Sequence, residues 1–310
     1  MRSIRQQAFG GPEVLELTEV ARPVPLPTEM LVRVRAAAVN PVETVIRSGQ
    51  FPLLGPPPFV LGWDVSGVVE DVEPGVTRFQ PGDEVYGMPF FPRAASAYAE
   101  YVAVPSRQLA RKPAGLSHAE AAALPLAGLT AWQALVDTAQ VAAGQRVLIH
   151  GAGGGVGHLA VQIAKARGAH VVGTASAAKH DLVASLGADE LIDYRAIDFA
   201  THVDGVDVVL DTIGGDIARR SIGVLHPGGL LVTIVGRRDV DLAARTRAAG
   251  RRFAGLSVEP DYPALEALAD LAESGTLRVH LQATPDLAEA AKAHELLESG
   301  GVTGKIALTV

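Results

Sequence analysis

The chain contains no cysteine among its 310 residues. This absence excludes disulfide bonds, thiolate metal sites and cysteine nucleophiles. The nine histidines form no His-Glu-x-x-His pattern or comparable pair, so we expect no bound metal. No apolar run approaches the ~20 residues that span a bilayer, and no apolar segment of a secretory signal follows the N-terminus. We therefore expect a protein of the cytoplasm that does not enter membranes.

Aromatic residues and charges are also scarce. Aromatics make up 5% of the chain and charged residues 20%, with a formal net charge of −7 and a pI near 5.7. No basic stripe offsets this acidity, which argues against a nucleic-acid partner. With 48% hydrophobic residues, the chain can bury a core, and its length suggests about two domains of ~150 residues each.

Residues 1–116 have the pattern of a β-rich region. Residues 30–36 alternate apolar and polar side chains with the period of a half-buried strand. Glycine and proline turns recur, as at residues 10–12 and 81–83. Such short strands predict a compact antiparallel barrel or sandwich. Ser117 and Glu120 then form a capping box that begins an alanine-rich helix.

From residue 120 onward, short apolar strands alternate with helices. This alternation predicts an α/β fold with a doubly wound parallel sheet of the Rossmann type. The predicted strands are 146–150, 170–173, 190–193, 206–210, 230–235 and 253–258, with helices at 156–167 and 179–186. Helices at 263–273 and 285–299 and a strand at 305–310 complete the chain.

A glycine-rich turn joins the strand at 146–150 to the helix at 156–167. It reads Gly151-Ala152-Gly153-Gly154-Gly155-Val156-Gly157. A turn in this position lets the backbone approach a pyrophosphate and offers it the N–H groups of a helix N-terminus. Valine at 156 breaks the strict G-x-G-x-x-G spacing, so we favour the register Gly151, Gly154 and Gly157. A tight turn without a ligand is the alternative.

The residues after the second strand bear on the choice of dinucleotide. No carboxylate that would bind the ribose 2′-OH of NAD precedes Asp181. Ser176 and Lys179 stand there instead, and they suit a 2′-phosphate. One unit-charge pair at 4 Å is worth about 1 kcal/mol in water and about 4 kcal/mol at an effective dielectric of 20. NADPH is therefore the predicted cofactor, with a solvated Lys179 as the alternative.

The ordered motifs resemble the zinc-free quinone oxidoreductase branch of the medium-chain dehydrogenase/reductase superfamily. The similarity runs through nearly the whole chain, and its carriers include residues 40–43, 61–69, 82–87, 127–132, 150–157, 211–215 and 227–229. The resemblance implies a GroES-like catalytic domain formed by residues 1–119 and 258–310. It also implies a Rossmann NADP-binding domain at 120–257 and a homodimer.

The resemblance further implies a set of cofactor-binding residues. Asn40 and Thr130 would lie near the nicotinamide, and Ser176, Lys179 and Tyr194 would surround the adenosine 2′-phosphate. Tyr194 is equally compatible with a half-exposed aromatic at a strand end. The full set is Asn40, Thr130, Gly154, Gly155, Val156, Ser176, Lys179, Tyr194, Thr212, Ile213, Val235, Gly236, Leu256 and Ser257.

The substrate implied by the resemblance is a small apolar electrophile. Zinc members of the superfamily carry metal ligands near the positions of Asn40 and Asp64, and we interpret Asp64 as a structural carboxylate. Without a metal, such an enzyme reduces a quinone or an α,β-unsaturated carbonyl compound by hydride transfer. The candidates for the substrate pocket are Asn40, Val45, Phe51 and Phe90. Related enzymes often have tyrosine at positions 45 and 51, so no general acid is assigned here.

Two other functions remain open at this point. An enoyl-thioester reductase of polyketide-type synthesis would need a basic surface for its carrier partner. The only dense basic cluster is Arg245, Arg247, Arg251 and Arg252, which also fits a solvated face. A protein that binds NADPH without catalysis is the second alternative, because a fold does not determine a function.

Overall fold

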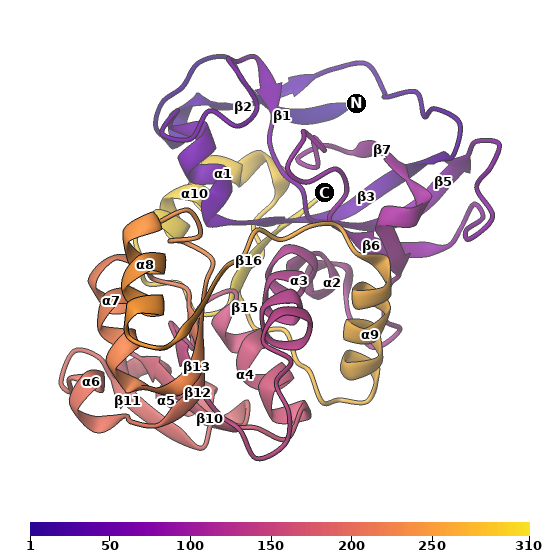
Figure 1. Ribbon diagram of the computed structural model, residues 1–310. Helices are drawn as coiled ribbons and strands as arrows, with labels where there is room; N and C mark the ends of the chain where they lie inside the picture. Colours follow the sequence, from indigo (N-terminus) through magenta and orange to yellow (C-terminus); the bar gives the residue numbers. More distant parts are fainter. The chain divides into compact units, whose positions relative to one another are not determined.

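The structure, a computed structural model, describes residues 1–310, and Figure 1 traces the chain. The chain forms two compact units. Unit 1 contains Met1–Leu129, Glu259–Gly275 and Val279–Val310, and unit 2 contains Thr130–Val258 and Thr276–Arg278. The first boundary follows Leu129 instead of residue 119, because the helix after residue 117 packs against strands of unit 1. No helix is both long enough and apolar enough to span a lipid bilayer.

Unit 1 is built mainly from antiparallel strands, as predicted. One sheet has the order β2-β1-β4, and a larger one has the order β15-β16-β3-β5-β6-β8, with β7 also paired to β3. Every pair is antiparallel except β15 with β16. The strands are β1 (Arg2–Gln6), β2 (Leu15–Glu19), β3 (Glu29–Val39), β4 (Phe59–Val60), β5 (Val65–Val72), β6 (Glu84–Gly87), β7 (Tyr101–Pro105), β8 (Leu109–Arg111), β15 (Leu281–Ala283) and β16 (Lys305–Thr309).

The long strand β3 supplies much of the core of this unit. Met30, Val32 and Val34 are buried in one cluster with Val65 and Val69 of β5. The predicted alternation of residues 30–36 therefore places one side of the strand in a hydrophobic core, where burial of apolar surface stabilises the sheet. Beyond residue 36 the strand is buried on both sides, and it ends directly before Asn40.

Five helices accompany the sheets of unit 1. They are α1 (Pro41–Arg47), α2 (His118–Ala123), α3 (Pro125–Trp132, which extends into unit 2), α9 (Tyr262–Glu273) and α10 (Ala290–Glu298). The predicted capping box is confirmed, since Ser117 Oγ accepts a hydrogen bond from the Glu120 N–H and Glu120 accepts one from the Ser117 N–H. The helix predicted at 285–299 begins later, because Asp286 caps a single 3-10 turn that precedes α10.

Unit 2 is a parallel sheet of six strands, which confirms the predicted doubly wound fold. The order is β11-β10-β9-β12-β13-β14, and every neighbouring pair is parallel. The elements are β9 (Arg146–His150), α4 (Gly157–Ala166), β10 (His170–Ala175), α5 (His180–Ser185), β11 (Glu190–Asp193), α6 (Phe199–His202), β12 (Val206–Asp211), α7 (Gly215–Val224), β13 (Leu225–Thr233), α8 (Val240–Ala248) and β14 (Arg252–Gly255). The strand order reverses between β9 and β12, and such a switch point is where doubly wound sheets bind ligands.

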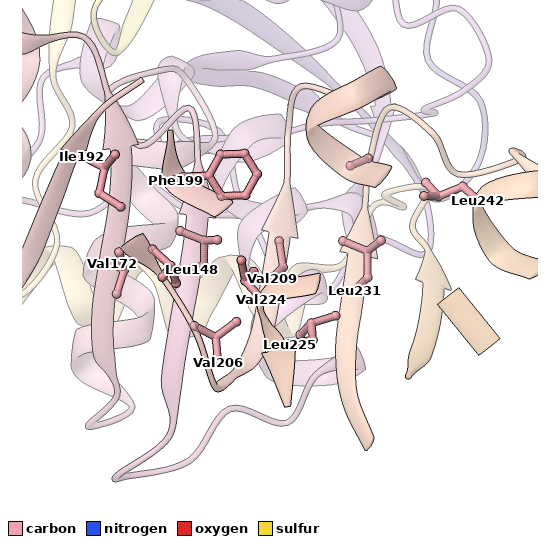
Figure 2. Close-up of a cluster of buried hydrophobic side chains, with 12 residues drawn as sticks. Leu148, Val172, Ile192, Phe199, Val206, Val209, Val224, Leu225, Leu231 and Leu242 are labelled. Carbon is pink, nitrogen blue, oxygen red and sulfur yellow. The ribbon is translucent and has the colours of Figure 1, made fainter. Parts of the chain in front are cut away.

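A hydrophobic cluster joins strands of unit 2 to helices α6, α7 and α8. Figure 2 shows its side chains on neighbouring strands, among them Leu148, Val172 and Leu231. Phe199 of α6 and Leu242 of α8 close the cluster from the helical side. The sequence did not indicate α7 or α8. The strand predicted at 253–258 ends at Gly255, where an added Cβ would lie only 2.1 Å from the carbonyl oxygen of Arg237.

Candidate cofactor and active site

The glycine-rich turn follows β9 and leads into α4, as predicted. Gly151 has a φ of +66°, which favours glycine. A Cβ at Gly157 would lie 2.1 Å from the carbonyl oxygen of Gly151, so only glycine fits where the helix meets the turn. At Gly154 the corresponding distance is 3.2 Å, which is tight but open to a small adjustment. The predicted register Gly151, Gly154 and Gly157 thus agrees with the structure, in which each of the three positions restricts or disfavours a side chain.

The start of α4 leaves backbone donors available. The Gly154 N–H bonds back to Gly151 O at 2.9 Å, whereas the N–H groups of Gly155 and Val156 take part in no backbone hydrogen bond. Unpaired N–H groups at a helix N-terminus, together with the partial positive charge of the helix dipole, form a site for an anionic phosphate. The geometry of the turn therefore fits a phosphate group.

A second positive region lies beside the turn. The stem of Lys179 packs against the turn, since a Cβ at Gly153 would lie 2.8 Å from Lys179 Cδ. Burial, followed by the neighbouring charge of Arg195, lowers the pKa of Lys179. Strands β10 and β11 are adjacent with Ala175 opposite Asp193. Ser176 and Tyr194, which follow these two residues, therefore leave the sheet side by side, and Tyr194 is 53% exposed.

The loops after β12 and β13 are tied together by Asp211. Its buried carboxylate accepts hydrogen bonds from the N–H groups of Ile213 (3.0 Å) and Gly214 (2.8 Å) and from Thr233 Oγ1 (2.6 Å). Thr233 Oγ1 in turn accepts from the Gly236 N–H at 3.0 Å. This arrangement fixes the backbone while leaving the side chain of Ile213 52% exposed.

The remaining predicted cofactor residues of unit 2 lie on neighbouring loops. Thr212 Oγ1 donates to His150 O at 2.8 Å, Val235 is 54% exposed, and the Leu256 N–H bonds to Thr233 O at 2.9 Å, with Ser257 next in the chain. Because carboxyl ends of parallel strands share one edge of a sheet, the structure brings the predicted residues from 154 to 257 to the same edge. Thr130 is buried within α3 and stands apart from these loops in the chain.

The buried histidine His150, at the end of β9, directly precedes the glycine-rich turn. The ring nitrogens of His150 lie 3.1 Å from Thr174 Oγ1 and 2.8 Å from Ser221 Oγ. Burial lowers the pKa of His150 to about 4, and the charge of Asp211 opposes this shift only in part. The histidine is therefore neutral at physiological pH and connects β9 to β10 and α7.

Asn40 is the centre of a buried polar cluster in unit 1. It caps α1, its backbone N–H donates to Glu43 Oε2 at 2.6 Å, and its Nδ2 donates to Asp64 Oδ2 at 2.9 Å. Lys305 Nζ donates to Asn40 Oδ1 and, at 3.1 Å, to Val39 O. Burial raises the pKa of Asp64 and lowers the pKa of Lys305, while the attraction between the two charges opposes both shifts.

The cluster continues away from Asn40 through a chain of hydrogen bonds. Tyr98 OH donates to Glu43 Oε2 at 2.8 Å and lies 3.2 Å from His294 Nε2. Arg47 connects His294 Nδ1, at 3.2 Å, to Glu298, at 2.7 Å. Burial raises the pKa of Glu43 to about 7, with a further contribution from the charge of Asp64. Burial, aided by Arg47, lowers the pKa of His294 to about 3.

The predicted substrate-pocket residues are brought together only in part. Val45 lies on α1 behind its cap Asn40, and the Phe51 N–H bonds to Val45 O at 3.1 Å. Phe90 has a φ of +61° and its N–H donates to Gln108 Oε1 at 2.7 Å. It lines a different hollow of about 340 Å³, which is bordered by Met1, Ser3, Phe59, Val60, Tyr101 and Val102.

Three arginines of the cluster at residues 245–252 make ion pairs or hydrogen bonds within unit 2. Arg245 pairs with Asp241 at 2.7 Å. Arg251 donates to Leu225 O at 2.9 Å, and Arg252 donates to Gly228 O at 2.9 Å. Both accepting carbonyls lie in the first half of β13, which favours a structural role for Arg251 and Arg252.

Sequence reasoning missed Lys305, Asp211 and Arg195. Lys305 begins the predicted strand 305–310, and a lysine at the start of an otherwise apolar strand is itself a signal of a buried cation. Asp211 ends a buried strand directly before Thr212, and its position could have indicated a carboxylate that caps the following loop. Arg195 follows Tyr194, and no local pattern distinguishes it from an exposed arginine.

Comparisons with known proteins cover the whole chain. The family "Alcohol dehydrogenase GroES-like domain" matches residues 26–114, and the family "Zinc-binding dehydrogenase" matches residues 186–308. A quinone oxidoreductase of Pongo abelii is 34% identical over 99% of this chain and 97% of its own length. A mycocerosic acid synthase-like polyketide synthase of Mycobacterium tuberculosis is also 34% identical, but only 15% of that protein is matched.

Solved structures show the same relationship. The quinone oxidoreductase from Coxiella burnetii matches with a TM-score of 0.95 and 37% identity, covering 100% of this chain and 99% of the other. Escherichia coli quinone oxidoreductase complexed with NADPH matches with a TM-score of 0.89 and 30% identity, covering 100% of both chains. CurK enoyl reductase matches with a TM-score of 0.90 and 26% identity, covering 99% of this chain and 98% of the other.

The description "Zinc-binding dehydrogenase" raises the question of a zinc site. Zinc is held in proteins by thiolate, imidazole and carboxylate ligands. No group of three or more His, Cys, Asp or Glu side chains is placed to hold a metal ion. Beside Asp64 stands the ammonium group of Lys305, 3.7 Å from Asp64 Oδ2. A cation that belongs to the chain thus pairs with Asp64, one of the two buried carboxyl groups next to Asn40, and these residues do not fit zinc.

Proposed function

Because the chain belongs to the quinone oxidoreductase branch of the medium-chain dehydrogenase/reductase superfamily, we propose that it is an NADPH-dependent reductase. Its substrates are small apolar electrophiles, either quinones or α,β-unsaturated carbonyl compounds. The observation that carries this proposal is the phosphate-binding geometry of residues 151–157 beside the positive region of Lys179 and Arg195. NADPH bound at this edge of the sheet supplies a hydride from its nicotinamide ring.

In this proposal the residues of the carboxyl edge bind the dinucleotide. The N–H groups of Gly155 and Val156, next to Gly154, bind the pyrophosphate. Ser176, Lys179 and Tyr194 surround the 2′-phosphate. The remaining residues of the edge border the dinucleotide along its length; they are Thr212, Ile213, Val235, Gly236, Leu256 and Ser257. We assign Asn40 and Thr130 to the nicotinamide end.

The side chains proposed near the substrate are apolar and offer no proton donor. Val45 and Phe51 provide apolar surface without a phenol hydroxyl near the substrate, whereas Phe90 lines a separate hollow. A quinone that accepts hydride becomes a hydroquinone anion, which takes its proton from water without a side-chain acid. An apolar pocket that holds the acceptor against the nicotinamide therefore suffices, since positioning supplies much of the acceleration.

Enoyl-thioester reduction is the second candidate. It is supported by the similarity to CurK enoyl reductase and to part of a polyketide synthase. The arginine cluster offers little for a carrier protein, because Arg251 and Arg252 already bind backbone carbonyls. We therefore place quinones and simple enones first.

The test follows nicotinamide absorbance with a panel of quinones, enones and enoyl thioesters. Rapid oxidation of NADPH with a quinone or enone, and slow oxidation of NADH, supports the proposal. Turnover confined to enoyl thioesters supports the second candidate. Tight NADPH binding without turnover on any acceptor contradicts both and favours a protein that binds the cofactor without catalysis.

We also propose that the protein works as a homodimer, which the family resemblance implies. Size-exclusion chromatography with light scattering tests this. A mass near twice 32.2 kDa is expected, and a mass near 32.2 kDa contradicts the proposal.

A further inference from the structure

Asn40 is the only asparagine in the chain, and the fold places it opposite a lysine. Strands β3 and β16 are antiparallel with Val39 opposite Ile306. This register brings Asn40, directly after β3, next to Lys305 at the start of β16. Asn40 is 2% exposed and Lys305 is 4% exposed, so water has little access to either side chain.

The ammonium group of Lys305 has three oxygen partners. It donates to Asn40 Oδ1 and to Val39 O at 3.1 Å, and it lies 3.7 Å from Asp64 Oδ2. An ammonium group has three hydrogens and no lone pair. The ammonium group thus makes two hydrogen bonds and one ion pair inside unit 1.

These partners dictate the orientation of the Asn40 carboxamide. The Lys305 ammonium can only donate, so it must face Oδ1. The Asp64 carboxylate can only accept when ionised, so it must face Nδ2, which lies 2.9 Å from Asp64 Oδ2 and 3.5 Å from Glu43 Oε1. A flipped carboxamide would set donor against donor and acceptor against acceptor within a site shielded from water.

The backbone around Lys305 is itself tightly held. The Lys305 N–H donates to His280 O at 2.9 Å. A Cβ at Gly304 would lie 2.2 Å from the same carbonyl oxygen, and Gly304 has a φ of +65°. Asp64 is likewise anchored, because its Oδ1 accepts from the Leu126 N–H at 2.7 Å. The lysine and the carboxylate thus form a rigid frame for Asn40.

We infer that Lys305 is a positioning residue of the reduction, which holds the Asn40 carboxamide in one orientation for the role that the proposed function gives to Asn40. The inference rests on the proposed function for the reaction, while the orientation of Asn40 is measurable without it. Lys305 touches neither substrate nor cofactor in this role and acts through Asn40 alone.

The orientation is tested by NMR on protein labelled with 15N-asparagine. A single asparagine gives one Nδ2 proton pair, so its signals need no further assignment. In the wild-type protein we expect the Nδ2 proton that is hydrogen-bonded to Asp64 to lie downfield of its position in a solvated side-chain amide. In Lys305→Met/Asp64→Ser, where both opposing partners are removed, we expect the pair to broaden or move to the position of a solvated amide. A wild-type pair at the position of a solvated amide, or an unchanged pair in the folded variant, overturns the inference.

The kinetic test compares the same variant with Lys292→Met. Lys292 is an exposed lysine that pairs with Glu289, so this control removes a lysine outside the cluster. For Lys305→Met/Asp64→Ser we expect kcat to fall about 10- to 100-fold, because small displacements at a reacting centre cost about this much. We expect the KM for NADPH to stay within about twofold, since the phosphate-binding residues lie on other elements.

The single variant Lys305→Met serves as a second comparison. It leaves Asp64 buried without its cation and is expected to lower stability more than the double variant does. A folded double variant with kcat close to wild type refutes the positioning role and leaves the proposed function standing. Wild-type protein that oxidises no NADPH with any quinone or enone refutes the proposed function, and the role of Lys305 in that reaction with it.

Discussion

Glu43 makes the stability of the protein fall as the pH rises from about 4.5 to about 7. Burial raises its pKa from 4.5 to about 7, and the nearby charge of Asp64 adds to this effect. Hydrogen bonds from the Asn40 N–H and Tyr98, and the charge of Lys305, oppose the shift only in part. Between these two pKa values the folded protein holds a proton that the unfolded chain has released.

The size of the effect follows from the linkage between proton binding and folding. The contribution of the protonated Glu43 to the free energy of unfolding is fully present below about pH 4.5. It is lost as the pH rises to about 7, and the total loss is near 3 kcal/mol. Glu43→Gln keeps the shape of the protonated carboxyl and removes its titration. We therefore expect the variant to gain about 2 to 3 kcal/mol on the wild-type protein between about pH 5 and pH 8.

The assay is urea unfolding of both proteins at the two pH values, with Glu16→Gln as the control. Glu16 is exposed on β2, so its replacement is expected to leave the pH dependence unchanged. The buried histidines titrate equally in both proteins and cancel in the difference. Parallel pH profiles of wild type and Glu43→Gln would refute the reasoning, because they would mean that Glu43 is ionised at little cost in the folded state.

Further predictions concern the cofactor edge of unit 2. Lys179→Ala should raise the KM for NADPH about 10- to 100-fold and change the KM for NADH little. The control Lys292→Ala should change neither KM. Equal effects of Lys179→Ala on the two KM values would contradict the assignment of Lys179 to the 2′-phosphate. Gly154→Val should abolish dinucleotide binding in a fluorescence titration while nearly keeping the thermal midpoint of unfolding in calorimetry. Gly157→Ala should lower that midpoint, because its Cβ would lie 2.1 Å from Gly151 O. The pKa of His150 is lowered from 6.5 to about 4, so stability should fall as the pH drops below 6.5, by about 3 kcal/mol at its limit. His150→Gln should flatten that part of the unfolding profile, and an unaltered profile would contradict a neutral buried histidine.

The fold of unit 2 was largely readable from the sequence because its signals are local. Strand β9 matches the prediction residue for residue, since an apolar run ends there at a glycine turn. Helix α8 was missed because it is rich in charge, and it forms where Asp239 caps its first turn and Leu242 reaches the core. The boundary at Leu129 depends on packing of α2 against strands formed elsewhere in the chain, which no local pattern encodes.

The candidate site was predictable to a different degree in each unit. The glycine spacing predicts the turn at residues 151–157. The order of the parallel strands then predicts that the neighbouring loops lie at the same edge of the sheet. The cluster around Asn40 does not, because Lys305 and Asn40 are 265 residues apart in the chain. Its donors and acceptors become complementary only when β16 joins β3, so their roles emerge from tertiary structure alone.

The most direct test of the central claim is the ratio of kcat/KM for NADPH to kcat/KM for NADH, measured with a quinone acceptor on wild type and Lys179→Ala. We predict a wild-type ratio well above ten that falls about fivefold or more in the variant, because the charge pair with the 2′-phosphate is worth about 1 to 4 kcal/mol. A wild-type ratio near or below one, or a ratio that Lys179→Ala leaves unchanged, would contradict the account.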